Sequence, residues 1–214
     1  MLQKTISIIK ELEKTEYFYD IANAKLFSPI LELKQSNYNC DKNFLCEMYP
    51  PLTDQEISEY SSCFIYDFPE ELKQFYKFTN GIRIFDRYIS VGGLEPFERL
   101  RPNHGGREYT PIQWIDTWGN SPRPKKHYGD GRLFFAMYKV EKPPYIYAYM
   151  DCADSSLIKP VHTCYAGSEE IIESWKSFDD WFFSEYKKYM GKFKNKEYKI
   201  ISIVDGVLNG LYFI

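Results

Sequence analysis

The segment from Phe68 to Gly93 constrains the fold more than any other stretch, because it predicts a helix, a turn and extended chain in immediate succession. Pro69 fits the first turn of a helix, where a missing N–H costs nothing. Apolar residues spaced three and four apart then predict one buried stripe, formed by Leu72, Phe75, Tyr76 and Thr79. Asn80-Gly81 suits a left-handed helix end, and the alternation from 82 to 91 predicts a half-buried strand.

Composition limits the classes of function. The chain has 214 residues, of which 44% are hydrophobic and 18% aromatic, enough to fill a core and favour strands. A net charge of -3 argues against direct binding to nucleic acid or to an anionic membrane. Apolar runs are too short to cross a bilayer. The charged N-terminus predicts no signal peptide, and we expect a cytoplasmic protein.

The cysteine pattern also favours a cytoplasmic protein. The five cysteines include no Cys-x-x-Cys pair, and they lie at Cys40, Cys46, Cys63, Cys152 and Cys164. This spacing predicts free thiols in a reducing compartment, with no metal site.

The chain divides into three expected regions. Residues 1–51 predict a helical extension packed on the main domain, with one helix over 3–14, a second helical piece over 17–27 and a loop from 30 to 51. Residues 52–191 predict an α+β domain. Residues 192–214 predict a basic segment followed by a hairpin.

Within the main domain, two capping signatures and three strands are expected. Thr53 and Glu56 form a capping box, and Ser177-Phe178-Asp179-Asp180 begins a helix that Gly191 ends. Runs over 132–140, 145–150 and 159–165 predict an antiparallel meander.

The long segment from Leu94 to Tyr128 shows little periodicity and interleaves basic with aromatic residues. That composition is typical of protein hot spots and of nucleic-acid sites, and equally of a solvated loop whose tryptophans pack into the core. With the net charge negative, we favour a protein partner. The candidate partner-binding residues are Arg101, Arg107, Tyr109, Trp114, Asp116, Trp118, Tyr128 and Asp151. Asp151 also fits a polar turn.

The sequence shows no catalytic constellation, so we expect no enzyme, no cofactor and no metal. His162 and Cys164 lie two apart on one predicted strand and could act as base and nucleophile, but no third, orienting group is evident. His104 stands in a glycine-rich loop without a nucleophile motif.

The order of these motifs resembles the SUKH superfamily, the domain shared by yeast cell-wall-assembly regulators and many bacterial immunity proteins. The resemblance runs from about Leu52 to Tyr189 and is carried by Phe68-Pro69-Glu70-Glu71-Leu72, Phe75-Tyr76, Thr79-Asn80-Gly81, Phe85 to Gly92, Leu133 to Ala136, Tyr145 to Tyr149 and Ser177 to Phe183. It implies an antiparallel or mixed sheet flanked by helices, and a protein-binding role without chemistry.

In bacteria, such proteins resemble antidotes that bind and neutralise a cognate toxin, often a nuclease. The alternatives are a regulatory scaffold of the cell-wall-regulator kind, and an enzyme of unrecognised type using His162, Cys164 or His104.

Overall fold

The computed structural model describes residues 2–14, 18–21, 24–27, 46–62, 66–86, 88–94, 131–140, 143–201 and 210–214. Its helices are α1 (Gln3–Leu12), α3 (Asp54–Ser61), α4 (Glu70–Tyr76) and α6 (Phe178–Lys194). Its strands are β1 (Phe18–Ile21), β2 (Ala24–Phe27), β3 (Cys46–Met48), β4 (Ile82–Ile84), β5 (Ile89–Val91), β6 (Arg132–Tyr138), β7 (Ile146–Asp151), β8 (Val161–Tyr165), β9 (Ile171–Trp175), β10 (Tyr198–Ile201) and β11 (Gly210–Phe213). None of the helices in these ranges is long and apolar enough to span a membrane.

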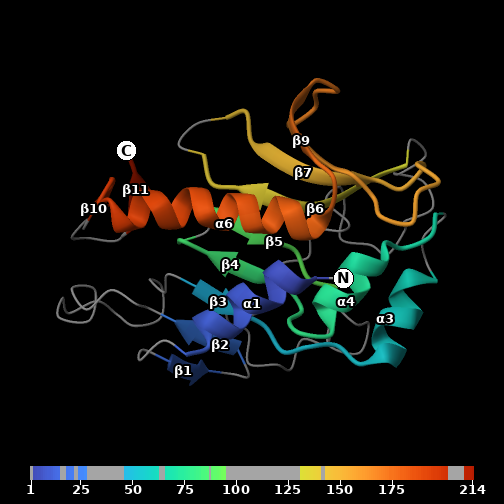
Figure 1. Cartoon of the computed structure of the whole chain (residues 1–214), viewed down its shortest axis with the longest axis horizontal. Helices are drawn as coiled ribbons and strands as arrows, with labels where there is room; N and C mark the ends of the chain where they lie inside the picture. The colour runs from blue at the N-terminus through green and yellow to red at the C-terminus, as the bar shows by residue number, and fades with distance from the viewer. Residues whose placement is uncertain are drawn as a thin grey trace.

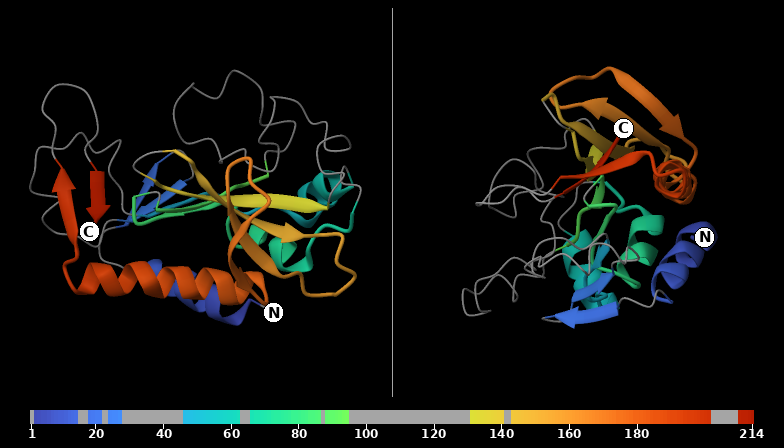
Figure 2. Two further views of the ribbon diagram at one scale, coloured as in Figure 1. Left: turned by 90° about the horizontal axis from the view of Figure 1, so that it is seen from above. Right: turned by 90° about the vertical axis from the view of Figure 1, so that its left-hand side faces the viewer.

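Nine strands form one sheet whose spatial order is the sequence order, β1 to β9. Every pairing among them is antiparallel, and β10 pairs with β11 in a separate antiparallel ribbon. The helices α1 and α6 contact each other along one face of this sheet (Figures 1 and 2). The predicted α+β class, the meander of β6, β7 and β8, and the C-terminal hairpin pairing are confirmed.

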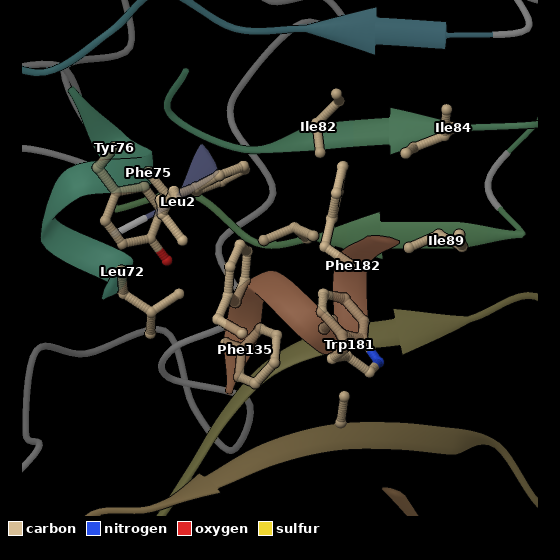
Figure 3. Close-up of a cluster of buried hydrophobic side chains, with 14 of the residues drawn as sticks. Leu2, Leu72, Phe75, Tyr76, Ile82, Ile84, Ile89, Phe135, Trp181 and Phe182 are labelled. Carbon is tan, nitrogen blue, oxygen red and sulfur yellow. The ribbon is translucent and has the colours of Figure 1, made fainter. Parts of the chain in front are cut away.

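Aromatic side chains of α6 fill the space between that helix and the sheet (Figure 3). The Trp181 ring packs edge-on against Phe135 of β6 with 5.0 Å between centroids, and the Phe178 ring lies 5.1 Å from Phe75 of α4. All four side chains are fully buried. The indole N–H of Trp181 donates to the Tyr138 hydroxyl at 2.7 Å, so its polar atom is satisfied inside the core.

The segment from Phe68 to Gly93 begins with a helix as predicted, but its extended part forms two strands and not one. The chain reverses at Phe85 and Asp86, both of which adopt left-handed φ angles of 53° and 55°, and β5 returns antiparallel to β4. A single alternating strand would have placed Ser90 in solvent, whereas Ser90 is buried. Asp86 accepts from the Lys139 ammonium at 2.8 Å, which fixes the reversal to the end of β6.

The N-terminal region contains strands where a second helix and a loop were predicted, and that prediction is wrong. β1 and β2 form a hairpin over residues 18–27, and β2 pairs with β3, which lies inside the predicted loop. A helix this short is marginal without strong packing, whereas pairing onto β3 satisfies the backbone of both strands.

One further strand and one helix end differ from the predictions. The strand β9 was not predicted. α6 continues through Gly191 to Lys194 because Phe193 still packs against the core and stacks on Tyr198 at 5.3 Å. Both predicted N-terminal caps are confirmed. The Glu56 amide donates to the Thr53 hydroxyl at 3.2 Å, and the Asp180 amide donates to Ser177 at 3.1 Å.

Two carboxylates link the N-termini of helices that are distant in sequence, and we call these contacts the capping relay. Glu71 of α4 accepts from the Phe178 amide at the start of α6 at 3.0 Å. Asp179 of α6 accepts from the amides of Thr5 at 2.8 Å and Lys4 at 3.2 Å, at the start of α1. Asp179, expected to cap its own helix, therefore caps α1 instead. Both acids stabilise the positive end of a neighbouring helix.

Replacing Asp179 by alanine should destabilise the protein by about 1–2 kcal/mol, because two amides of α1 lose their acceptor and the Thr5 amide is buried. Urea unfolding measures the loss. The matched control is Asp180→Ala, which removes only a partly exposed ion pair with Lys4 and should cost about 0.5 kcal/mol or less. Equal losses for the two variants would contradict the capping role.

Candidate functional site

Seven of the eight residues predicted to bind a partner lie outside the described residues, as does His104. These seven are Arg101, Arg107, Tyr109, Trp114, Asp116, Trp118 and Tyr128, and their role stays a prediction. Asp151 is described and ends β7. Its carboxylate accepts from the Ala153 amide at 3.0 Å and the Asp154 amide at 3.3 Å. This geometry matches the polar-turn interpretation of Asp151.

The described residues on either side of the segment 95–130, Leu94 and Gly131, lie at one end of the sheet, since β5 and β6 are antiparallel neighbours. The buried Asn80 side chain holds Leu94 by two bonds, accepting from its amide at 2.6 Å and donating to its carbonyl at 2.5 Å. Gly131 has a φ of +82°, and a Cβ there would approach the Ala153 amide nitrogen at 2.9 Å. The glycine is therefore required at this point.

Five side chains from three neighbouring strands form a continuous row that we call the aromatic strip. They are Arg132 and Phe134 of β6, Tyr147 and Tyr149 of β7, and His162 of β8. The Arg132 guanidinium lies 5.9 Å from the ring centroids of both Phe134 and Tyr149. The Phe134 centroid lies 5.3 Å from that of Tyr149 and 6.1 Å from that of Tyr147, and Tyr149 lies 5.3 Å from His162.

Strand alternation places the strip on the sheet face opposite α6. Ala148 and Met150 of β7 are fully buried and lie on the α6 side, so Tyr147 and Tyr149 lie on the other side. Phe134, Tyr149 and His162 are direct neighbours in register across β6, β7 and β8. From the sequence, these residues were predicted only as strand positions. The signal that could have identified them is the alternation of tyrosine with small or apolar residues in Tyr145 to Met150.

The strip has the composition of a protein-binding surface. Arginine and tyrosine dominate binding hot spots, and the Arg132 guanidinium, which lies near two aromatic rings and near the Glu169 carboxylate, brings positive charge to the strip. Phe134, Tyr147 and His162 are half-buried, which leaves part of each ring at the surface, whereas Tyr149 between them is buried. Aromatic rings also stack on nucleic-acid bases, but the strip carries one full cation among five residues, too few for a phosphate backbone.

The residues considered for catalysis do not form an activated pair. The Nδ1 atom of His162 lies 2.7 Å from the Ser174 hydroxyl, and in the described part of the chain no carboxylate bonds its other ring nitrogen. Burial raises the pKa of the Cys164 thiol despite the nearby Arg132 charge, so the sulfur stays protonated and is a poor nucleophile. The described residues also contain no group of three potential metal ligands.

One buried acid belongs to α6 itself, on the opposite side of the sheet from the strip. Glu185 is 1% exposed, and its Oε1 atom lies 3.5 Å from the Lys188 ammonium. Its Oε2 atom has no hydrogen-bond partner. Burial, the dominant cause, raises the pKa of this carboxyl. A raised pKa is a mark of some catalytic acids, but this carboxyl is enclosed by the core and would not contact a substrate.

Comparison with known protein families matches residues 51–184, more than half of the chain, to the SMI1 / KNR4 family (SUKH-1). The match includes α3, α4, all strands from β4 to β9, and the whole aromatic strip. The predicted resemblance to the SUKH superfamily is therefore confirmed. No curated protein matches the chain, and no solved structure matches it.

The buried carboxyl predicts a specific pH dependence of stability. Because the pKa of Glu185 is higher in the folded than in the unfolded state, folding takes up a proton just above the ordinary glutamate pKa. Its contribution to the free energy of unfolding therefore falls as the pH rises through that window. Glu185→Gln should flatten the slope and make the protein more stable at pH 7.5 by about 1 kcal/mol.

Urea unfolding between pH 4.5 and 8 tests this, with the exposed Glu59→Gln variant as control. A gain that is the same at every pH, or a loss of stability at pH 7.5, would contradict the assignment.

Proposed function

The chain belongs to the SMI1/KNR4 family (SUKH-1), and from this premise we propose that it is an immunity protein that binds and neutralises a cognate bacterial toxin. Domains of this family typically mediate protein–protein interactions. The family match covers the strands that carry the aromatic strip. The proposed binding surface is thus part of the family domain.

The aromatic strip is the single observation that carries the proposal. Its side chains stand on three adjacent strands whose opposite face is packed against α6, so their positions are set before a partner arrives. A preformed surface loses little conformational freedom on binding. Large rings beside an arginine supply contact area and directional hydrogen bonds together.

The mechanism is occlusion of the toxin. A surface that covers an active site or a substrate groove abolishes activity without any chemistry of its own, which agrees with the buried Cys164 thiol and with a His162 ring that bonds Ser174 and no carboxylate in the described part of the chain. A toxin that cleaves nucleic acid needs a basic groove. A chain of net charge -3 is complementary to such a groove and would associate rapidly with it.

The cysteines support a cytoplasmic site of action. Cys46, Cys152 and Cys164 are buried and free. Burial raises the pKa of Cys46 and of Cys152 to about 12, so these thiols are unreactive and structural. Unpaired cysteines are the usual state in a reducing compartment.

Co-expression with the product of the adjacent gene tests the proposal, with cell growth and co-purification as readouts. The wild-type chain should rescue growth and form a complex. Arg132→Ala and Tyr147→Ala should each weaken binding by about tenfold or more with little change in the urea midpoint. The matched control is Phe78→Ala, which truncates an exposed aromatic residue that follows α4, away from the strip.

Two outcomes would contradict the proposal. Absence of both binding and rescue would exclude the immunity role, and recovery of host cell-wall regulators in its place would favour the scaffold alternative. Binding that survives the strip variants but is lost in Phe78→Ala would show that the surface is wrongly placed.

A further inference from the structure

The strand β9 is the terminal strand of the sheet and is exposed on both faces. In the described part of the chain it pairs with β8 and with no other strand. Its first four residues are exposed, including Ile171 at 48% and Ile172 at 40%. An edge strand presents a row of backbone donors and acceptors to solvent, and here the exposed side chains of Ile171 and Ile172 accompany that row.

The edge is also acidic. Glu169, Glu170 and Glu173 are exposed, and the sequence from 165 to 175 contains no lysine, arginine or histidine. The Arg132 guanidinium lies 3.9 Å from the Glu169 carboxylate, which is itself 92% exposed. Proteins commonly protect edges with lysine or proline, whereas this edge carries negative charge beside isoleucine.

A β-bulge makes the edge selective. Thr163 of β8 pairs with Glu173, and Cys164 pairs with Ile171, so Ile172 is an extra residue without a partner in β8. Bulges twist an edge strand and disfavour pairing with flat, unrelated strands. A segment that pairs here must match both the local twist and the charge.

The edge is continuous with the aromatic strip. The Ser174 hydroxyl of β9 lies 2.7 Å from Nδ1 of His162, the strip residue on β8. A protein seated on the strip would therefore extend directly over β9.

We propose that β9 binds an extended, basic segment of the protein partner, which adds to the sheet as a further antiparallel or parallel strand. The inference rests on the proposed function in one respect, namely that the partner is a protein. Main-chain hydrogen bonds would supply affinity, lysine or arginine side chains of the segment would meet Glu170 and Glu173, and its apolar side chains would cover Ile171 and Ile172.

A second copy of this chain is disfavoured as the occupant. Pairing β9 with itself would bring glutamates of the two copies together, and like charges opposite each other destabilise a strand pair. A basic strand turns the same charges into attraction. Charge complementarity thus selects the partner class.

Hydrogen exchange on the full chain tests this without any toxin. Two soluble probes are used, the peptide Lys-Val-Lys-Val-Lys-Val and its acidic counterpart Glu-Val-Glu-Val-Glu-Val. The basic peptide should slow exchange of β9 amides by about threefold or more at millimolar concentration, and the acidic peptide should not. Glu170→Lys combined with Glu173→Lys should reverse the preference. The matched control is Glu13→Lys with Glu59→Lys, which changes the net charge equally at exposed sites elsewhere.

The hydrogen-exchange experiment has three outcomes that lead to different conclusions. Equal protection by both peptides, or protection outside β9, would overturn the charge-selected edge. Protection of β9 that rises with protein concentration in the absence of peptide would instead show a second copy as the occupant. If the basic peptide protects β9 but the adjacent gene product does not bind, the edge site stands and the immunity role fails.

Discussion

The capping relay is the interaction on which the rest of the structure depends. Glu71 bonds the first amide of α6, and Asp179 bonds the first amides of α1, so each helix N-terminus is completed by a side chain from another helix. Burial raises the pKa of Glu71, and the Phe178 and Asp179 amides oppose that rise. These contacts set α6 against the sheet, and Trp181 then enters the core. They also join the N-terminal segment to the family domain.

The helices α6 and α1 cover one face of the sheet, and the aromatic strip lies on the opposite face. Asn80 and Gly81, which follow α4, have structural roles. Asn80 holds Leu94, and Gly81, with a φ of +99°, lies so close to Gly93 that a Cβ would approach the Gly93 amide nitrogen at 3.0 Å. On the opposite face, Tyr149 of the strip is buried, whereas Phe134, Tyr147 and His162 are half-buried. In the proposed function, the partner binds the strip face, while the helices pack on the other face of the same strands.

The features that could be predicted from the sequence are those that depend on residues close together in the chain. The caps at Thr53 and Ser177 and the meander depend on residues a few positions apart, and each was predicted correctly. The contact between Asp179 and Thr5 spans 174 positions, so no local pattern reveals it. The hairpin of β1 and β2 depends on pairing with β3, and the exposed β9 lacks the alternation of a half-buried strand. The strip was missed because its tyrosines fit a core strand equally well, and most of the predicted site lies outside the described residues.

Native-state hydrogen exchange of the Thr5 amide tests the central claim, that the relay makes α1, α4 and α6 one unfolding unit. We expect the Thr5 amide to open with the same free energy as the Trp181 amide in α6, within about 1 kcal/mol. We also expect Glu71→Gln to lower both opening free energies together. A Thr5 opening energy several kcal/mol below that of Trp181, unchanged by Glu71→Gln, would show that α1 is an independent layer and would contradict the account.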